Sequence, residues 1–233
     1  MTVGLDRRIA EEIDYRSELM EAARSPSRSR RKFSQLLVSG KASKELLRGW
    51  AVNWFYFEKN VPKKDAAIIS NCDIVSVRRL WVTKILEHDG FGHNRGAIEG
   101  WLKFAIGLGL TNHAVTEARY LDGVTSAVAD YLSFVRSKSW VEGIATSIGM
   151  LFVPEFVVQR LVAFRRYYPW VEPNALDYFR ELYSKARKDG RAAMQLVIRY
   201  ADTPTLKADS IKAASVGSEI QDRIMQSIME RFG

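Results

Sequence analysis

Aromatic and cationic side chains, spaced along segments that read as helices, are the residues of this sequence best suited to chemistry. His88 ends an expected helix over 80–88, where the helix dipole favours the protonated imidazole, so it is either an ordinary capping residue or a usable acid–base group. Taken singly, each residue of the set is more simply explained as a core aromatic or a surface lysine. The set comprises Trp50, Trp54, Tyr56, Lys64, Lys84, His88, Tyr131, Arg160 and Tyr178.

The residues give little support to metal or nucleophile chemistry. The chain has three histidines, and none follows a glutamate by three positions, as a helical di-iron carboxylate site requires. The glycine-rich segment 90–96 matches neither nucleotide-binding fingerprint. There is no G-x-S-x-G motif, and the single Cys72 has no histidine nearby. We therefore expect no resident metal and no classical nucleophile.

The elements that must position the candidate side chains read as helices throughout. The clearest stripe runs over 175–200, where apolar residues follow the three–four spacing of one helix face, although Gly190 could kink or break it. Segments 121–136 and 220–232 repeat this spacing, and no run alternates with period two for long. The sequence predicts an all-α fold. Because no linker is longer than a normal loop, we expect a single domain over 1–233.

Capping residues and loop signals divide the chain into its helices. The Ser-Pro-Ser segment 25–27 separates the first expected helix from the second. Ser43 can cap a third helix, and Pro62 suits the first turn of a fourth. Further loops are expected at 89–96 and 168–173.

The most apolar stretch, 144–164, is long enough to be tested as a membrane span. Pro154, Glu155 and Arg160 fall in its centre and second half, and a charge near the centre of a membrane helix costs about 2.5–3.5 kcal/mol. We therefore expect the buried central helix of a bundle and no membrane partner. Buried Glu155 and Arg160 would then need partners, and bundle interiors are where ligand sites form.

Composition and charge restrict the class of protein. With 233 residues, 47% hydrophobic and 27% charged, the chain is neither disordered nor low-complexity. One cysteine excludes a disulfide framework, and the charged N-terminal sequence has no apolar signal core, so a cytoplasmic location is expected. The net charge of +8 favours acidic partners. The basic run at 24–32 is either a solvated stretch or an anion-binding segment, and nucleic acid is an unlikely partner.

Ordered motifs run along the chain, densely over 40–110 and more loosely over 120–200. They are Gly49-Trp50 with Asn53, Phe55-Tyr56, Pro62-x-Lys64-Asp65-Ala66-Ala67-Ile68, Asn71-Cys72, Arg78-Arg79-x-Trp81-Val82, Ile85-Leu86-x-His88-Asp89-Gly90, Ile98-Glu99-x-Trp101-Leu102, Trp140, Leu151-Phe152-x-Pro154 and Tyr168-Pro169-Trp170. Together they resemble the pyrroloquinoline-quinone synthase family. The resemblance implies a haem-oxygenase-like (TenA-like) bundle of about seven helices, usually a homodimer, with a ligand cavity among the helices.

The resemblance also implies an activity. That family closes a ring and carries out a multi-electron oxidation of a tricarboxylate-bearing precursor with O₂, using neither a metal nor a redox cofactor. Carried onto this sequence, its site consists of the catalytic residues His88, Tyr131 and Tyr178 and the substrate-binding residues Lys64, Lys84, Arg160, Glu58 and Arg28.

Several positions depart from the family pattern. Lys84 replaces an arginine, Glu58 replaces a glutamine, and Arg28 falls at one of a Tyr-His pair. Two arginines, a second histidine and a lysine are replaced by Trp54, Leu182, Val157 and Gly217. The loss of cations weakens the case for a tricarboxylate ligand, and the loss of a histidine weakens the case for the same acid–base chemistry.

The expected function is therefore a cofactor-independent, O₂-using oxidase in a biosynthetic pathway. Its substrate would be a small aromatic or amino-acid-derived acid, and its product would not be pyrroloquinoline quinone itself. One alternative is a non-catalytic relative that binds a small molecule or a partner protein. An iron-dependent oxidase fits less well, because positions that would supply metal ligands are Met150, Val157 and Leu182.

Overall fold

The computed structural model describes residues 2–24 and 28–233, and over these ranges the prediction of an all-α fold is confirmed. The expected break at 25–27 lies outside the described residues. Among those described there are more helices than the seven expected, because short helices and 3₁₀ turns join the longer ones. They are α1 (Thr2–Arg24), α2 (Arg28–Val38), α3 (Lys44–Glu58), α4 (Val61–Ser70), α5 (Val75–Asp89), α6 (Gly96–Gly107), α7 (Asn112–Thr116), α8 (Asp122–Ser137), α9 (Trp140–Ala145), η1 (Ile148–Phe152), α10 (Val153–Tyr167), η2 (Pro173–Leu176), α11 (Asp177–Tyr200) and α12 (Pro204–Phe232).

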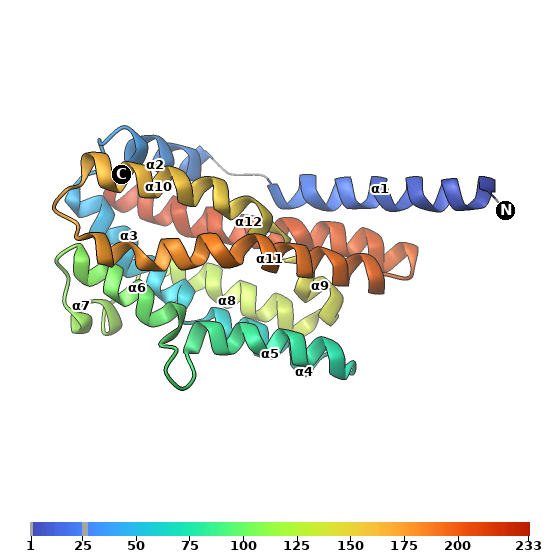
Figure 1. The fold of residues 1–233 in the computed structure, drawn as a ribbon. Helices are drawn as coiled ribbons and strands as arrows, with labels where there is room; N and C mark the ends of the chain where they lie inside the picture. The colour runs from blue at the N-terminus through green and yellow to red at the C-terminus, as the bar shows by residue number, and fades with distance from the viewer. Residues whose placement is uncertain (1, 25–27) are drawn as a thin grey trace.

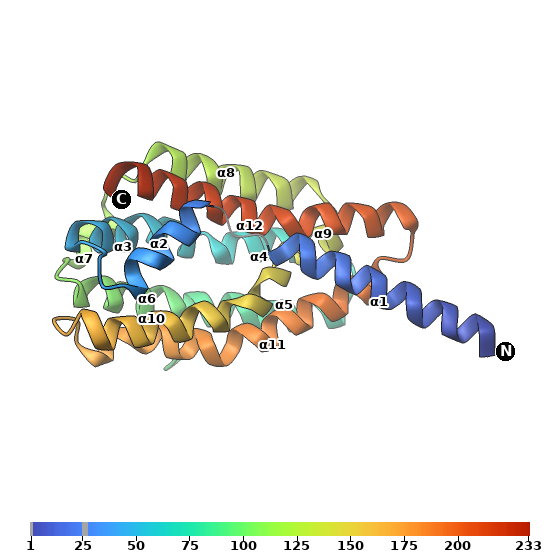
Figure 2. The same ribbon diagram turned by 90° about the horizontal axis from the view of Figure 1, so that it is seen from above.

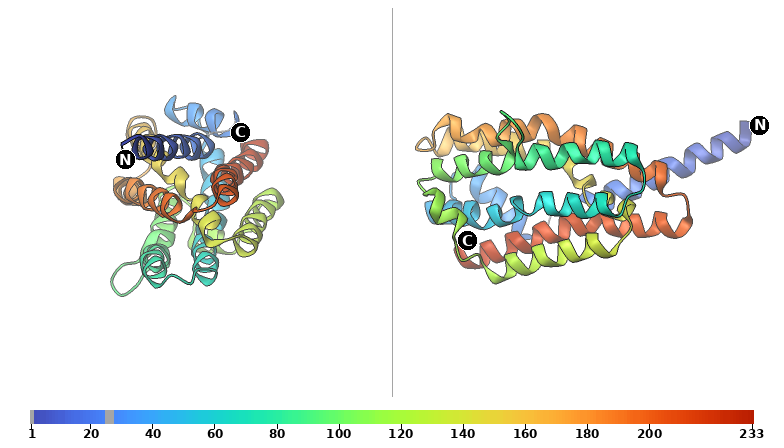
Figure 3. Two further views of the ribbon diagram at one scale, coloured as in Figure 1. Left: turned by 90° about the vertical axis from the view of Figure 1, so that its right-hand side faces the viewer. Right: turned by 90° about the horizontal axis from the view of Figure 1, so that it is seen from below.

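The long helices lie roughly along one direction and form an elongated bundle (Figures 1 and 2). Helix α12 packs against α1, α2, α3, α8 and α9, and α10 packs against α11 and α2. Viewed end-on, the helices surround a shared interior (Figure 3, left). The first part of α1 extends past one end of the bundle (Figures 1 and 2). This arrangement lets side chains from distant parts of the sequence meet inside.

The capping residues act as the sequence predicts. The Ser43 side chain accepts a hydrogen bond from the backbone N–H of Leu46 at the start of α3, and Pro62 lies in the first turn of α4. Gly190, in contrast, does not break α11. A Cβ at this glycine would lie 2.5 Å from the backbone nitrogen of Leu151. Gly190 is therefore required for the close approach of α11 to η1.

The apolar stretch 144–164 is not one central helix. It is divided among α9, η1 and α10, and α10 begins where Pro154, in its first turn, prevents a preceding helix from continuing. Glu155 is exposed, contrary to the expectation that it would be buried. By length and composition the segment Trp140–Tyr167 could cross a membrane, because it contains an 18-residue window with a mean hydropathy of 1.6. Half of that window, however, is buried within the fold.

A cluster of aromatic rings holds α3, α6, α10 and α11 together. The rings of Trp50 and Trp101 meet edge to face with centroids 5.2 Å apart. Phe104 contacts Phe179 at 4.9 Å and Phe164 at 5.5 Å, also edge to face. All five side chains are buried. Edge-to-face pairs add about 0.5–1.5 kcal/mol each beyond the burial of area, so this cluster fixes the helices that carry the site.

Gly217 on α12 lies against Thr146, the residue that follows α9. A Cβ at this position would collide with the carbonyl oxygen of Thr146. We expect Gly217→Ala to lower the free energy of unfolding by about 1–3 kcal/mol, because overpacking outweighs the gain in helix propensity. Gly100→Ala is the matched control, since its Cβ would meet Tyr178 at an ordinary 3.5 Å. Urea unfolding of both variants tests this; equal stability of the two would contradict it.

Candidate functional site

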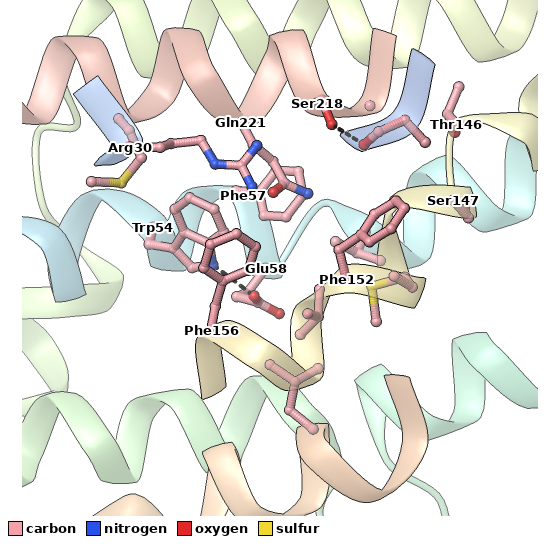
Figure 4. Close-up of a pocket in the computed structure, with 18 of the residues that line it drawn as sticks. Arg30, Trp54, Phe57, Glu58, Thr146, Ser147, Phe152, Phe156, Ser218 and Gln221 are labelled. Carbon is pink, nitrogen blue, oxygen red and sulfur yellow. Dashed lines mark hydrogen bonds between the residues drawn. The ribbon is translucent and has the colours of Figure 1, made fainter. Parts of the chain in front are cut away.

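A cavity of about 340 Å³ lies inside the bundle. Its walls come from helices along the whole described chain, from the end of α1 to α12. Aromatic rings make up much of the surface, and the close-up in Figure 4 shows several of them around the buried carboxyl group of Glu58. The aromatic lining consists of Phe33, Trp54, Phe57, Trp101, Tyr131, Phe152, Phe156 and Tyr178.

The structure brings together all the site residues predicted from the sequence except Arg28. That arginine is exposed, at the first residue of α2, and does not line the cavity. The others come from six helices and line the cavity together: Glu58 from α3, Lys64 from α4, Lys84 and His88 from α5, Tyr131 from α8, Arg160 from α10 and Tyr178 from α11.

Glu58 accepts hydrogen bonds at the centre of this group. Its side chain is 6% exposed, and one oxygen, Oε1, accepts from Trp54 Nε1 and from the Tyr178 hydroxyl, both at 2.8 Å (Figure 4 shows the first). Its other oxygen, Oε2, lies 3.9 Å from His88 Nε2. The carboxylate is thus held by two donors on one oxygen while the other oxygen faces the histidine.

His88 lies in the last turn of α5, as expected. Its Nδ1 lies 3.1 Å from the backbone carbonyl oxygen of Lys84. We assign the proton to Nδ1, because a carbonyl oxygen can only accept. In the neutral ring, Nε2 then carries a lone pair on the side of Glu58 and can take a proton from a bound molecule.

The two tyrosines are buried hydrogen-bond donors. Burial, followed by the neighbouring Glu58 carboxylate, raises the pKa of Tyr178 well above its ordinary value. Burial also raises the pKa of Tyr131, although nearby Lys64 opposes this, and the Tyr131 hydroxyl donates to Thr146 Oγ1 at 2.8 Å. Both hydroxyl groups therefore stay protonated at neutral pH and already have acceptors.

Lys64 is buried beside its own counter-ion. Its Nζ lies 2.7 Å from Asp65 Oδ1 and donates to Ser147 Oγ at 3.1 Å. Burial lowers the pKa of Lys64, but the Asp65 carboxylate and other neighbours outweigh this and raise the pKa overall. Asp65 also accepts a hydrogen bond from Trp81 Nε1 at 2.8 Å.

Lys84 is neutralised in the same way. Its Nζ lies 2.8 Å from Asp189 Oδ1, on α11, and 5.0 Å from the centre of the Trp81 ring. A buried pair with a short contact cancels most of the field that either charge would exert alone. Both lysines that were expected to bind a substrate anion therefore already have an aspartate of this chain as partner.

Arg160 is in a different state. Its guanidinium carbon lies 5.3 Å from the centre of the Trp50 ring. Within the described residues, no carboxylate forms an ion pair with it. Burial, and then the positive charge of Arg30, lower its pKa to about 10. The guanidinium is still charged at neutral pH, so it is available to an anion.

Several polar groups at the cavity are not among the site residues predicted from the sequence. Asp189 lies eleven residues after Tyr178, three helical turns along the same face of α11, so helix periodicity was the available signal. Arg30 and Arg31 line the cavity from within the basic run that was noted as a possible anion-binding segment. Arg30 pairs with Asp222 at 3.2 Å. Ser147 had no sequence signal.

The structure also shows whether side chains could bind a metal and where the residues that depart from the family pattern lie. Over 2–24 and 28–233, no group of three or more His, Cys, Asp or Glu side chains could hold a metal ion. Trp54, Met150, Leu182 and Gly217 line the cavity, whereas Val157 is fully buried outside its lining. Apolar groups therefore occupy cavity positions where the resemblance implied cations.

Comparison with known proteins agrees with the motifs. Residues 28–219 match the model of the TENA/THI-4/PQQC family. The pyrroloquinoline-quinone synthase of Pseudomonas aeruginosa is 40% identical over 172 residues, which is 73% of this chain and 69% of that protein. The enzyme of the same name from Cronobacter sakazakii is 39% identical over 166 residues, 71% of this chain and 66% of the relative.

Two solved structures show the same fold. One is a domain of unknown function with a haem-oxygenase-like fold from Shewanella denitrificans, with a TM-score of 0.75 and 13% identity, covering 98% of this chain and 93% of the other. The second is a TenA homologue from Pseudomonas syringae, with a TM-score of 0.67 and 10% identity, covering 95% and 92%. The expected haem-oxygenase-like fold is confirmed.

Proposed function

This chain belongs to the TENA/THI-4/PQQC family, and from that premise we propose that it is an O₂-using oxidase of a small aromatic or amino-acid-derived acid. The observation that carries the proposal is one aromatic cavity of about 340 Å³ that holds both His88 and the unpaired cation Arg160. An acid–base group and an anion-binding group on opposite parts of a bound molecule are what an oxidase of an aromatic acid requires.

The side chains divide the work as follows. Trp54, Phe57 and Phe156 enclose the aromatic ring, and Arg160 binds the carboxylate. His88 Nε2 takes one proton from the carbon or nitrogen that is oxidised. The substrate loses two electrons and two protons in each step, and O₂ takes them up to give H₂O₂. We propose that this needs no resident metal or redox cofactor.

The product is proposed to differ from pyrroloquinoline quinone. Three cavity positions where the resemblance implies an arginine or lysine carry Trp54, Leu182 and Gly217. A tricarboxylate placed here would lack cationic partners for some of its charges, and a buried unpaired charge is costly. The retained histidine and the smaller cationic set favour a less acidic substrate.

A binding protein without catalysis is the second candidate, favoured by the state of the two tyrosines. Their hydroxyl groups already donate to Glu58 and Thr146, so neither is free to stabilise a developing negative charge unless it changes partner. Under this alternative the cavity retains a small molecule and no O₂ is consumed.

We expect purified protein, stripped of metal, to consume O₂ and release peroxide with at least one member of a panel of aromatic acids. The panel includes the pyrroloquinoline-quinone precursor, which we expect to be a poor substrate. An oxygen electrode and a peroxide assay make the measurement, repeated after iron is added. Turnover that appears only with iron would contradict the metal-free proposal, and ligand binding by thermal shift without O₂ uptake would favour the binding protein.

A further inference from the structure

The charges around the cavity are paired unevenly. Lys64 and Lys84 are each held within 2.8 Å of an aspartate of this chain. Arg30 is paired with Asp222 at 3.2 Å. Two cations that line the cavity contact a ring face rather than a carboxylate: Arg160, over Trp50, and the exposed Arg24, over Phe152. Because Arg24 is exposed to solvent, which screens its charge, a ligand anion inside the cavity is attracted mainly to Arg160.

The two carboxylate oxygens of Glu58 also differ in their hydrogen bonds. Its Oε1 accepts two hydrogen bonds, from Trp54 and Tyr178. Within the described residues its Oε2 accepts none, and the group that faces it is His88 Nε2 at 3.9 Å, which is too far for a hydrogen bond. With the His88 proton on Nδ1, Nε2 is also an acceptor. Two acceptors thus face each other across a short gap.

A ligand nitrogen that carries at least two N–H groups would donate to both acceptors. A nitrogen placed to one side of the line that joins them can lie about 2.8–3.0 Å from each, which is ordinary N–H···O and N–H···N geometry. A protonated amine carries three N–H groups and a positive charge, so it suits a buried carboxylate better than a neutral hydroxyl group does. The carboxylate of Glu58 supplies the matching negative charge.

Arg160 and Glu58 are connected through aromatic side chains, of which Trp101 and Tyr178 line the cavity and Trp50 is buried outside its lining. Arg160 lies over Trp50, the rings of Trp50 and Trp101 meet at 5.2 Å, and Trp101 meets Tyr178 at 5.0 Å. Tyr178 in turn donates to Glu58. The cation and the carboxylate thus lie at the two ends of one run of aromatic side chains, and two of its rings, Trp101 and Tyr178, can contact an aromatic molecule that carries opposite charges at its ends.

We propose that the cavity binds a zwitterion: an aromatic compound whose single carboxylate pairs with Arg160 and whose protonated amine lies between Glu58 Oε2 and His88 Nε2. This deepens the proposed function by naming the charge pattern of the substrate, and it rests on that function for the aromatic acid itself. A second carboxylate buried away from the exposed Arg24 would have no cationic partner, at a cost of several kcal/mol for each unpaired charge.

Three probes that share a 4-hydroxyphenylethyl skeleton and differ in their charged groups, together with an aromatic tricarboxylate, test the proposal by isothermal titration calorimetry at pH 7. They are L-tyrosine (zwitterion), 3-(4-hydroxyphenyl)propanoate (carboxylate alone), tyramine (amine alone) and benzene-1,2,4-tricarboxylate. L-Tyrosine is expected to bind best. Loss of either charged group should weaken binding roughly 10- to 150-fold, the range that corresponds to one hydrogen bond to a charged group. The tricarboxylate should bind worst.

Two variants assign the two charges. Glu58→Gln keeps an oxygen for Trp54 and Tyr178 but removes the negative charge, so L-tyrosine should lose its advantage over the propanoate while the propanoate binds as before or better. Arg160→Gln should weaken the binding of L-tyrosine and of the propanoate and leave that of tyramine unchanged. Glu99→Gln is the matched control for a lost negative charge, because Glu99 is paired with Arg95 outside the cavity lining, and it should change nothing.

The results that would overturn the proposal are specific. They are tighter binding of the tricarboxylate than of L-tyrosine, an unchanged ratio of L-tyrosine to propanoate affinity in Glu58→Gln, or no binding of any probe. None of these measurements uses O₂. If the expected selectivity is found while no acid supports O₂ uptake, the zwitterion site stands and the oxidase function fails, so the two failures are distinguishable.

Discussion

Replacing His88 with asparagine is expected to lower kcat for O₂ uptake about 10²- to 10⁴-fold, the usual contribution of a positioned acid–base group. Asparagine can still donate a hydrogen bond to the carbonyl oxygen of Lys84, as His88 Nδ1 does. It removes the Nε2 atom that faces Glu58 at 3.9 Å. The loss should therefore fall on the proton-transfer step, and KM should change much less than kcat.

The control for this variant is His93→Asn, because His93 is exposed in the turn between α5 and α6. Its kcat should match that of the unaltered protein. A variant His88→Asn with more than a tenth of the original kcat would show that another group takes the proton. Thermal unfolding of both variants separates a catalytic loss from a folding defect.

Replacing Asp65 with alanine is expected to lower the free energy of unfolding by about 3–5 kcal/mol. The change leaves the Lys64 ammonium buried without its counter-ion, 2.7 Å away in the native protein, and also removes the acceptor of Trp81 Nε1. Because the pKa of Lys64 is raised above 10.5, the lysine's contribution is complete below that pH and is lost only as the pH rises through the higher folded value. Urea unfolding at pH 7 measures the loss.

The double variant Lys64→Met with Asp65→Leu separates the cost of the orphaned charge from the cost of lost packing. Apolar residues of similar size often replace a buried ion pair with little loss, so the double variant should recover most of the stability. If it is no more stable than Asp65→Ala, the buried charge is not the cause. Asp73→Ala, at an exposed position after α4, is the control for a lost aspartate.

The parts of the fold that the sequence predicts are those set by local rules. A serine cap at Ser43, a proline in a first turn at Pro62 and the apolar stripe of 175–200 each depend on residues within a few positions of one another. The hydrophobicity of the stretch 144–164 predicts burial but not the turn that η1 makes, so the expected single central helix is wrong. The role of Gly190 depends on Leu151, which is 39 residues away, so rules of local sequence do not predict it.

The candidate site likewise has residues that the sequence predicts and residues that it does not. The motif residues placed His88, Lys64 and Tyr178 at a common cavity, because the family resemblance carries the three-dimensional arrangement with it. The partners that change their chemistry were not found from sequence. Asp189 reaches Lys84 from another helix, and the availability of Arg160 becomes visible only when the neighbours of every cation are known. Charge count along the chain cannot reveal which charges are already paired.

The cavity wall has a consequence for how the chain responds to whatever fills it. Residues from Ala23 near the end of α1 to Met225 in α12 line the cavity, so no short stretch of chain carries part of the site on its own. A ligand then has affinity for the assembled bundle and essentially none for its fragments. Its binding therefore raises the free energy of global unfolding, by about 2.7 kcal/mol at a hundredfold excess of ligand over Kd. Amide hydrogens that exchange only through global unfolding would therefore exchange more slowly when the cavity is occupied, even in helices that do not contact the ligand.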